Sequence, residues 1–362
     1  MPDAASRPTP PPRRAVPTRV LLADDCEAAQ RELVELLSQQ PGIEVVGRAR
    51  DGEEALRLAL HLRPDCICLD LAMPRMDGFT FLRLLMSRQP TPVIVVSASA
   101  AKRDVFKALE LGAIDFVEKP APGEGRDVSV VREELAAKMS TLRALRLDGA
   151  AAAGPASPQL FAAAGRPTRL AVIGASTGGP PAVGRVLAAL PRDLPLAFAV
   201  AQHMPEKFTH TFAERLARNT GLDVREAREG EELADRRVLV APGGKHLRLV
   251  RTGGPLGPVR AALVEPGPSD ASLWCPSVDV LFTSAADAMG HRVCAVVLTG
   301  MGSDGRRGVE RVKEAGGLAL AESEASAVVF GMPREAADTG KVDEVLPLDA
   351  MADRLRRFAE GS

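Results

Sequence analysis

The sequence lacks three features that would each place it in a broad functional class: a long apolar run, a large excess of one charge, and a metal-binding cysteine pattern. No apolar run approaches the roughly 18 residues of a membrane span, so we expect no membrane insertion. The 46 lysine and arginine residues nearly balance the 47 aspartate and glutamate residues, which leaves a net charge of −1. This balance gives no indication of binding to nucleic acid or to an anionic membrane.

The cysteine content is also low and uninformative for metal binding. The five cysteines lack metal-ligand spacing, and they are Cys26, Cys66, Cys68, Cys275 and Cys294. Two of them lie on one face of an apolar strand, where buried free thiols are common. The first 17 residues contain prolines and arginines but no apolar core of a signal peptide. We therefore expect a disordered tail at residues 1–17 and a reducing, cytoplasmic location.

What the sequence does contain is a regular alternation of apolar strands and amphipathic helices. Its 362 residues are enough for two domains. In the first, residues 18–138, the near-continuous apolar strands between helices indicate a parallel sheet covered on both faces. We expect strands at 19–23, 44–49, 66–69, 93–96 and 115–117, and helices at 27–37, 53–62, 79–86 and 103–111.

Polar residues follow these strands at the edge where functional groups of parallel sheets gather. They are Asp24, Asp25, Asp70, Ser97 and Lys119. Three converging carboxylates repel one another unless a divalent cation lies among them, and oxygen ligands favour Mg²⁺. The lysine and the hydroxyl could hold the other oxygens of a phosphoryl group, which makes Asp70 the candidate phosphate acceptor. Helix capping is the simpler reading of one such acid, but it does not account for all five positions.

Four stretches carry a resemblance to the receiver domain of two-component response regulators. They are Leu22-Ala-Asp-Asp25, Asp70-Leu-Ala-Met-Pro-Arg-Met-Asp-Gly78, Val95-Val-Ser97 and Phe116-Val-Glu-Lys-Pro120. The resemblance implies that a histidine kinase phosphorylates Asp70. It also implies that Ser97 and Phe116 reorient on activation, with Phe116 replacing the tyrosine often found there. A receiver domain is a switch, so an effector is expected downstream.

A linker at residues 139–166 and a second α/β domain at 167–362 are expected to follow. A helix is predicted at 128–147, and the linker then consists of small residues without apolar periodicity. Turn residues at 253–255 predict an antiparallel hairpin that interrupts the second parallel sheet. The fold class is therefore two α/β domains, a flavodoxin-like receiver and a Rossmann-like domain with a hairpin. In the second domain we expect strands at 170–173, 196–201, 238–240, 246–250, 259–264, 294–298 and 318–320, and helices at 182–190, 209–219, 278–289, 308–315 and 351–358.

Residues 170–180 combine an apolar run, a glycine-rich turn and a helix start around Ser176. This loop could cradle a phosphate or present a serine nucleophile beside an oxyanion hole. The sequence has neither a Gly-x-Gly-x-x-Gly with an acidic partner downstream nor the lysine of a P-loop. A nucleophile would instead need a general base and a group that orients it.

His203 is the candidate base and Asp304 the candidate acid. His203 follows the strand that ends at Ala201, whereas His61, His210, His246 and His291 are interpreted as structural. Asp304 lies in a glycine-rich turn after a strand and could accept the imidazole Nδ1–H. Among the other acids, Asp279 and Asp287 are interpreted as cap or surface groups. The order Ser, His, Asp differs from that of chymotrypsin, subtilisin and α/β-hydrolases, so a standard hydrolase is a poor fit.

With these residues the chain, from about Thr18 to its C-terminal helix, closely resembles the CheB family, chemotaxis response regulators with a protein-glutamate methylesterase domain. The resemblance rests on Ile173-Gly-Ala-Ser-Thr-Gly-Gly179, Gln202-His-Met-Pro205, Phe208 to Leu216, Ala241-Pro-Gly243, Pro276-Ser-Val-Asp-Val280, Leu298-Thr-Gly-Met-Gly302 and Gly331-Met-Pro333. It implies a triad of Ser176, His203 and Asp304, with Thr177 and Met301 lining an oxyanion hole through backbone N–H groups. No cofactor is expected for the ester hydrolysis itself.

The resemblance further implies partners and regulation. The substrates would be glutamate methyl esters on methyl-accepting chemotaxis receptors, with deamidation of certain receptor glutamines, and the phosphodonor would be a CheA-type kinase. The unphosphorylated receiver would cover the edge that holds Ser176. Two alternatives remain: a receiver-controlled module that binds phosphate without turnover, and a DNA-binding regulator. The second is opposed by the balanced charge and by the lack of a basic recognition helix after Arg166.

Overall fold

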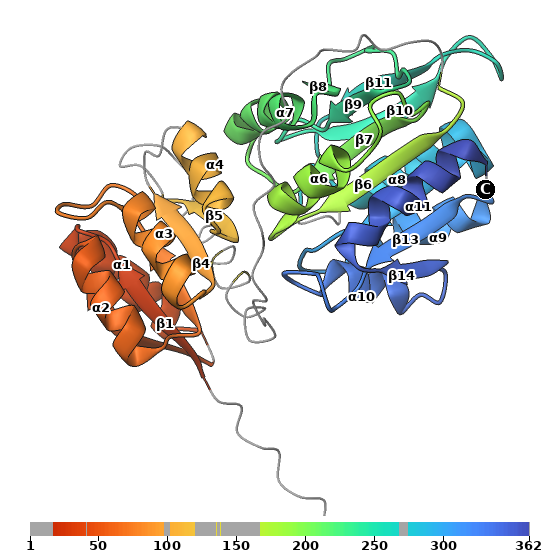
Figure 1. Cartoon of the computed structure of the whole chain (residues 1–362). Helices are drawn as coiled ribbons and strands as arrows, with labels where there is room; N and C mark the ends of the chain where they lie inside the picture. Colours follow the sequence, from red (N-terminus) through yellow and green to blue (C-terminus); the bar gives the residue numbers. More distant parts are fainter. Residues whose placement is uncertain are drawn as a thin grey trace, which may run out of the picture.

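The computed structural model describes two α/β units (Figure 1). The described residues are 17–40, 42–97, 102–119, 135, 138, 167–267 and 274–361, with backbone only at 102 and 103. The expected tail except residue 17, the linker and most of the helix predicted at 128–147 therefore lie outside the described residues. Within the described part of the chain, every helix is too short or too polar to cross a membrane.

The first unit is a five-stranded parallel sheet of order β2-β1-β3-β4-β5, which confirms the predicted arrangement. Its strands except the edge strand β2 are mostly buried, and their alternate residues point into apolar clusters on opposite faces of the sheet. Leu21 and Ile67 belong to one cluster, and Leu22 and Cys68 to the other. Its elements are β1 (Thr18–Ala23), α1 (Glu27–Ser38), β2 (Ile43–Ala49), α2 (Gly52–Leu62), β3 (Cys66–Leu69), α3 (Gly78–Arg88), β4 (Val93–Ser97), α4 (Lys102–Glu110) and β5 (Asp115–Glu118).

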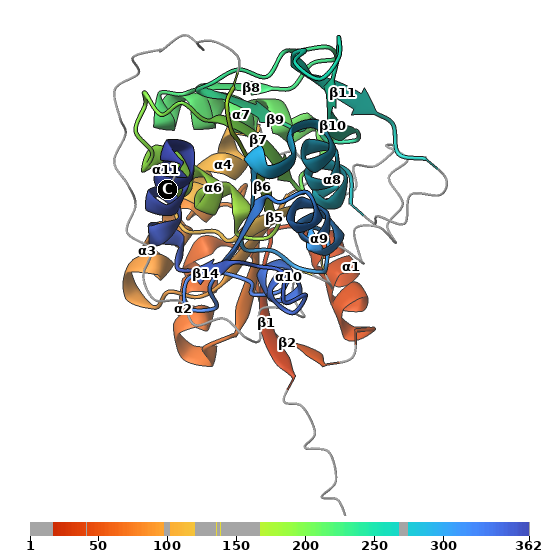
Figure 2. The ribbon, with the colours of Figure 1, turned by 90° about the vertical axis from the view of Figure 1, so that its right-hand side faces the viewer.

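The second unit is built on a seven-stranded parallel sheet of order β14-β13-β12-β6-β7-β9-β8. Figure 2 shows α6 and α11 on one side of β6, and α8 and α9 on the other. Its elements are β6 (Leu170–Ala175), α6 (Gly179–Ala188), β7 (Ala197–Gln202), α7 (Glu206–Thr220), β8 (Asp223–Glu226), β9 (Arg237–Val240), β10 (His246–Arg251), β11 (Val259–Val264), α8 (Val278–Met289), the 3₁₀ helix η2 (Gly290–Arg292), β12 (Val293–Val297), α9 (Arg306–Glu314), β13 (Leu318–Glu322), α10 (Met332–Ala337), β14 (Glu344–Leu346) and α11 (Leu348–Glu360).

The hairpin is where the structure corrects the sequence analysis of the fold. Strands β10 and β11 do pair antiparallel, but they form a separate two-stranded sheet and do not interrupt the parallel one. The reason is that β9 is already paired on both sides, with β7 and with β8, an edge strand that the apolar pattern did not predict. The hairpin packs instead against α8, where the Leu249 N–H donates to Ser284 Oγ at 3.0 Å.

The two units meet through α4 and β5 of the first and α7 of the second (Figure 1). The rings of Phe106 and Phe212 stack at 6.1 Å, and those of Phe116 and Phe208 lie 4.5 Å apart. A backbone hydrogen bond of 3.1 Å also joins the units, and it ends in the serine loop at the Gly178 N–H. The receiver thus contacts the predicted catalytic edge.

Candidate active site

Three neighbouring strands bring Ser176, His203 and Asp304 to one edge of the second sheet. Strand β6 lies between β7 and β12, all three run parallel, and the register pairs Ala175 with Gln202. Ser176 follows β6, His203 follows β7, and Asp304 lies in the loop after β12. The carboxyl ends of parallel strands meet at the same edge, which is where ligands bind to open α/β sheets.

The loop that carries Ser176 is held from two sides. The Ser176 N–H donates to the Thr299 carbonyl at 3.0 Å, and Gln202 Nε2 donates to the Ser176 carbonyl at 2.8 Å. A Cβ at Gly179 would lie 2.1 Å from Gln202 Oε1, so this close approach requires glycine. The same holds at Gly300, where a Cβ would lie 2.8 Å from Ser176 Cβ. The glycines therefore allow the strand ends to pack directly against the serine.

His203 and Asp304 form a buried pair. His203 Nε2 lies 2.9 Å from Asp304 Oδ2, and the two side chains are 3% and 6% exposed. The prediction that His203 Nδ1 makes this contact is wrong, because Nε2 makes it. Asp304 lies two strand spacings away, about 10 Å at roughly 4.8 Å each, so only the ring nitrogen farther from the backbone reaches it. Nδ1 is buried and has no hydrogen-bond partner among the described residues.

The start of α8 holds the Asp304 carboxylate in place. It accepts hydrogen bonds from Ser277 Oγ at 2.9 Å, from the Val278 N–H at 2.8 Å and from the Asp279 N–H at 2.9 Å. Burial raises the pKa of Asp304, but the hydrogen bond and charge of His203, aided by the backbone donors, outweigh it and lower the pKa overall. Asp304 is therefore ionised and suited to stabilise an imidazolium.

Thr177 and Met301, the expected oxyanion-hole residues, lie on the two loops that meet at Ser176. Thr177 is buried, and its carbonyl accepts a hydrogen bond from Thr299 Oγ1 at 2.9 Å. Among the described residues, no acceptor takes the Thr177 N–H. Met301 follows Gly300, the residue packed against Ser176. Their assignment to an oxyanion hole stays a prediction.

For two residues near the triad, Trp274 and Asp279, the sequence did not predict the contacts that the structure shows. Trp274 stacks on the His203 imidazole, with centroids 4.9 Å apart and an interplanar angle of 8°. Asp279, interpreted as a cap or surface group, accepts the N–H groups of Gly305 and Gly308 at 2.9 and 2.7 Å and so holds the loop of Asp304. The position of Trp274, two residues before the Pro276-Ser-Val-Asp motif, was the available signal.

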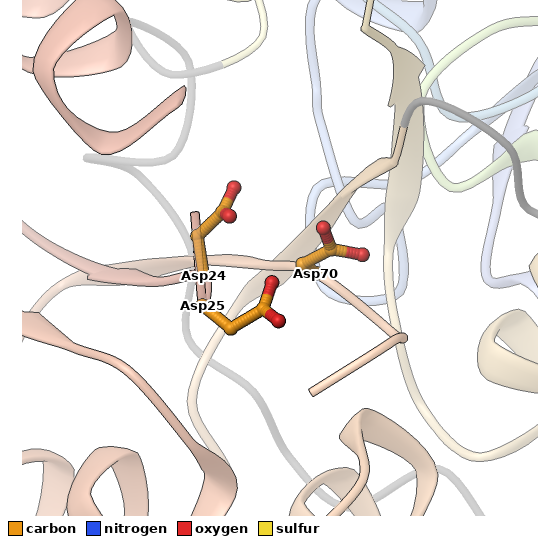
Figure 3. A group of neighbouring side chains, drawn as sticks. All are labelled: Asp24, Asp25 and Asp70. Carbon is orange, nitrogen blue, oxygen red and sulfur yellow. The ribbon is translucent and has the colours of Figure 1, made fainter. Parts of the chain in front are cut away.

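The three receiver carboxylates also converge (Figure 3). Ligand oxygens of Asp24, Asp25 and Asp70 all lie within 4.8 Å of one another. Lys119 Nζ donates to Asp70 Oδ2 at 2.7 Å and also contacts Asp24. Burial lowers the pKa of Lys119, but the charges and hydrogen bonds of Asp70 and Asp24 raise it overall. An all-oxygen donor set of this kind fits Mg²⁺.

The expected switch residues Ser97 and Phe116 lie on β4 and β5, the two strands that follow β3 in the sheet. Ser97 is the last residue of β4, and its carbonyl accepts the Lys119 N–H at 3.1 Å. Phe116 on β5 is buried against Phe208 of α7. A small cavity between the two units is lined by Ser97, Phe116 and Phe208, among others. The residues expected to respond to phosphorylation thus border the interface with the second unit.

Comparison with known proteins yields two family matches. The CheB methylesterase family matches residues 171–355, and the response regulator receiver domain matches residues 20–126. A protein-glutamate methylesterase/protein-glutamine glutaminase of Anaeromyxobacter dehalogenans is 56% identical over 94% of this chain and 95% of its own length. One from Geobacter sulfurreducens is 45% identical over 93% and 96%. The crystal structure of the Thermotoga maritima CheB methylesterase catalytic domain is 38% identical, covering 52% of this chain and 97% of that one, with a TM-score of 0.49.

Proposed function

Because the chain belongs to the CheB methylesterase family and carries a response regulator receiver domain, we propose that it is a phosphorylation-activated protein-glutamate methylesterase. Its substrates are glutamate methyl esters of methyl-accepting chemotaxis receptors, and it also deamidates receptor glutamines. The observation that carries the catalytic assignment is the buried His203–Asp304 contact beside the Ser176 loop. The function is sensory adaptation in chemotaxis.

Each member of the triad has one role in the acyl transfer. Ser176 Oγ attacks the γ-carbonyl carbon while His203 accepts the serine proton, at Nδ1 because Nε2 is engaged with Asp304. Asp304 stabilises the resulting imidazolium. The tetrahedral oxyanion is bound by the backbone N–H groups of Thr177 and Met301.

Collapse of the tetrahedral intermediate breaks the ester bond, and the imidazolium of His203 gives its proton to the departing methanol. Water, deprotonated by the same imidazole, then hydrolyses the acyl-enzyme to glutamate and frees Ser176. With a glutamine substrate the leaving group is ammonia, and the other steps are unchanged. Both reactions therefore need the same three side chains.

Methanol release from methylated receptor membranes tests this assignment. Replacing Ser176 with alanine should lower the rate by at least about 10³-fold, since the triad acts as a unit. Ser303, an exposed serine next to Asp304, provides the matched control, and Ser303→Ala should retain activity. A binding module without turnover predicts instead that Ser176→Ala leaves demethylation unchanged.

In the receiver, Asp70 accepts the phosphoryl group from a CheA-type histidine kinase. Asp24, Asp25 and Asp70 would hold Mg²⁺, which neutralises the charge of the phosphoryl oxygens. Lys119 contacts Asp70 and Asp24 and can pair with a further phosphoryl oxygen. Acetyl phosphate with and without Mg²⁺, read by phosphoprotein yield, tests this arrangement.

The unphosphorylated receiver inhibits the esterase by covering its edge. The Ile114 carbonyl accepts the Gly178 N–H, two residues after Ser176, and Phe116 packs against Phe208. Phosphorylation would shift this interface and open the edge. A chain that starts at Pro167 should therefore be faster than the unphosphorylated full-length chain, and equal rates would refute the inhibition.

A further inference from the structure

A buried carboxylate outside the triad supports the loop after β12. This loop in turn holds the backbone of the nucleophile, Ser176. Glu322 is the last residue of β13 and is fully buried. Its Oε2 accepts the Thr299 N–H at 2.8 Å, and its Oε1 accepts the Ser326 hydroxyl at 3.0 Å. Ser326 Oγ in turn accepts the Leu348 N–H at 2.9 Å, so the carboxylate is itself fixed in position.

Thr299 connects Glu322 to the nucleophile. Its carbonyl accepts the Ser176 N–H at 3.0 Å, and its hydroxyl donates to the Thr177 carbonyl at 2.9 Å. The hydroxyl also accepts the Val329 N–H at 2.8 Å. Thr299 is fully buried, so each of these groups depends on a protein partner. The position of Thr299 therefore sets the position of both Ser176 and Thr177.

A side chain is needed at this point because the sheet ends there. Strands β12 and β13 pair only as far as Val297 with Ala321. Beyond that pair the ladder between them ends, and without Glu322 the Thr299 N–H would be left buried without a partner, which is costly. The Glu322 carboxylate takes the place of the missing backbone acceptor.

We infer that Glu322 is a positioning residue for the esterase reaction: it holds Thr299 and thereby the Ser176–Thr177 loop in catalytic geometry. The inference rests on the proposed role of Ser176 as the nucleophile. It adds to the triad a residue that touches neither the substrate nor the reacting atoms.

The site uses Glu322 as a hydrogen-bond acceptor more than as a charge. Burial raises the pKa of Glu322, and the hydrogen bonds from Thr299 and Ser326 offset this only in part. An uncharged acceptor of the same shape should therefore serve as well. Glutamine provides that acceptor, whereas leucine fills similar space and offers none.

The experiment compares the full-length chain with Glu322→Leu and Glu322→Gln in the methanol-release assay, with circular dichroism to establish folding. Glu324→Gln, an exposed acid two residues away, is the matched control. Because misplacement by about 1 Å can cost about 10²-fold, we expect kcat of Glu322→Leu to fall by about 10- to 100-fold. KM should stay within about twofold, and Glu322→Gln should restore kcat to within about threefold of the parent.

A folded Glu322→Leu with unchanged kcat would overturn the inference, as would a Gln variant as slow as the Leu variant. If the Leu variant does not fold, Glu322→Asp decides, because its shorter side chain cannot span the 2.8 Å contact to the Thr299 N–H without moving the loop. A folded Asp variant with a selective fall in kcat supports the inference, and one with parent kcat refutes it. Activity in Ser176→Ala would instead refute the proposed function itself.

Discussion

Replacing Asp304 with asparagine separates the charge of the triad acid from its shape. Each oxygen of the Asp304 carboxylate accepts one backbone N–H, Val278 at Oδ2 and Asp279 at Oδ1. Either orientation of an asparagine amide would therefore place its NH₂ group against a backbone donor. A buried N–H donor without an acceptor lowers the free energy of unfolding by about 1–3 kcal/mol. The ionised partner of His203 would also be lost, which lowers kcat on the order of 10⁴-fold.

The stability difference should depend on pH in one direction. Burial raises the pKa of Asp304, but the contacts with His203 and the backbone N–H groups lower it below its usual value of about 3.9. A carboxyl with a lowered folded pKa contributes stability above its unfolded pKa and loses it as the pH falls through the folded value. The difference in unfolding free energy between the parent chain and Asp304→Asn should therefore be largest near neutral pH and should decrease below about pH 4.

Urea unfolding at neutral and acidic pH, together with methanol release, measures both effects. Asp287→Asn is the matched control because Asp287 is exposed and pairs with Arg311 at the surface, where such pairs contribute up to about 1 kcal/mol. A folded Asp304→Asn chain with kcat within tenfold of the parent would refute the triad role. A pH-independent stability gap would refute the reasoning about ionisation.

Three further predictions concern the surroundings of the site. Trp274→Leu should lower kcat by about 2- to 30-fold, because an aromatic face stabilises a cation by about 0.5–2 kcal/mol. Trp274→Phe should recover part of this loss, and an unchanged kcat in Trp274→Leu would contradict a role for the His203 stack. Asp70→Asn should abolish the stimulation of methanol release by acetyl phosphate but keep the unstimulated rate, and retained stimulation would place the phosphate elsewhere. Phe106→Ala should raise the unstimulated rate several-fold by removing the stack on Phe212, and a rate that stays at the parent level would indicate that this contact does not hold the receiver in place.

The sequence predicted the buried elements of the fold well and the edges of the second sheet poorly. Helix α8 and strand β3 have the predicted bounds, because each is an apolar run with a clear start, and the Ser277 side chain caps α8. Strands β8 and β14, by contrast, are short edge strands: β8 is mostly polar, and β14 has only three residues. Such strands are stabilised by pairing with a neighbour and carry little apolar signal of their own.

In the site, too, some features could be predicted from the sequence and others depend on how the strands pack. The convergence of Ser176, His203 and Asp304 follows from their positions after parallel strands, which the sequence pattern reveals. Which imidazole nitrogen reaches Asp304 depends on the order β12-β6-β7, and the periodicity does not give that order. The contact from Glu322 to Thr299 joins residues 23 apart, one at the end of β13 and one in the loop after β12, with no motif that links them.

The hydrogen bonds that hold residues 176–178 indicate what phosphorylation can change. The Ser176 N–H and carbonyl are both held within the methylesterase unit, by Thr299 and Gln202. Among the described residues, the hydrogen bond that the receiver makes to this loop is the one from the Gly178 N–H to the Ile114 carbonyl. Loss of the receiver contact would therefore leave the nucleophile in place and free one N–H beside it. We expect regulation to act on access to the edge, while kcat of the accessible enzyme is set by residues of the methylesterase unit, among them Thr299, Gln202 and the triad.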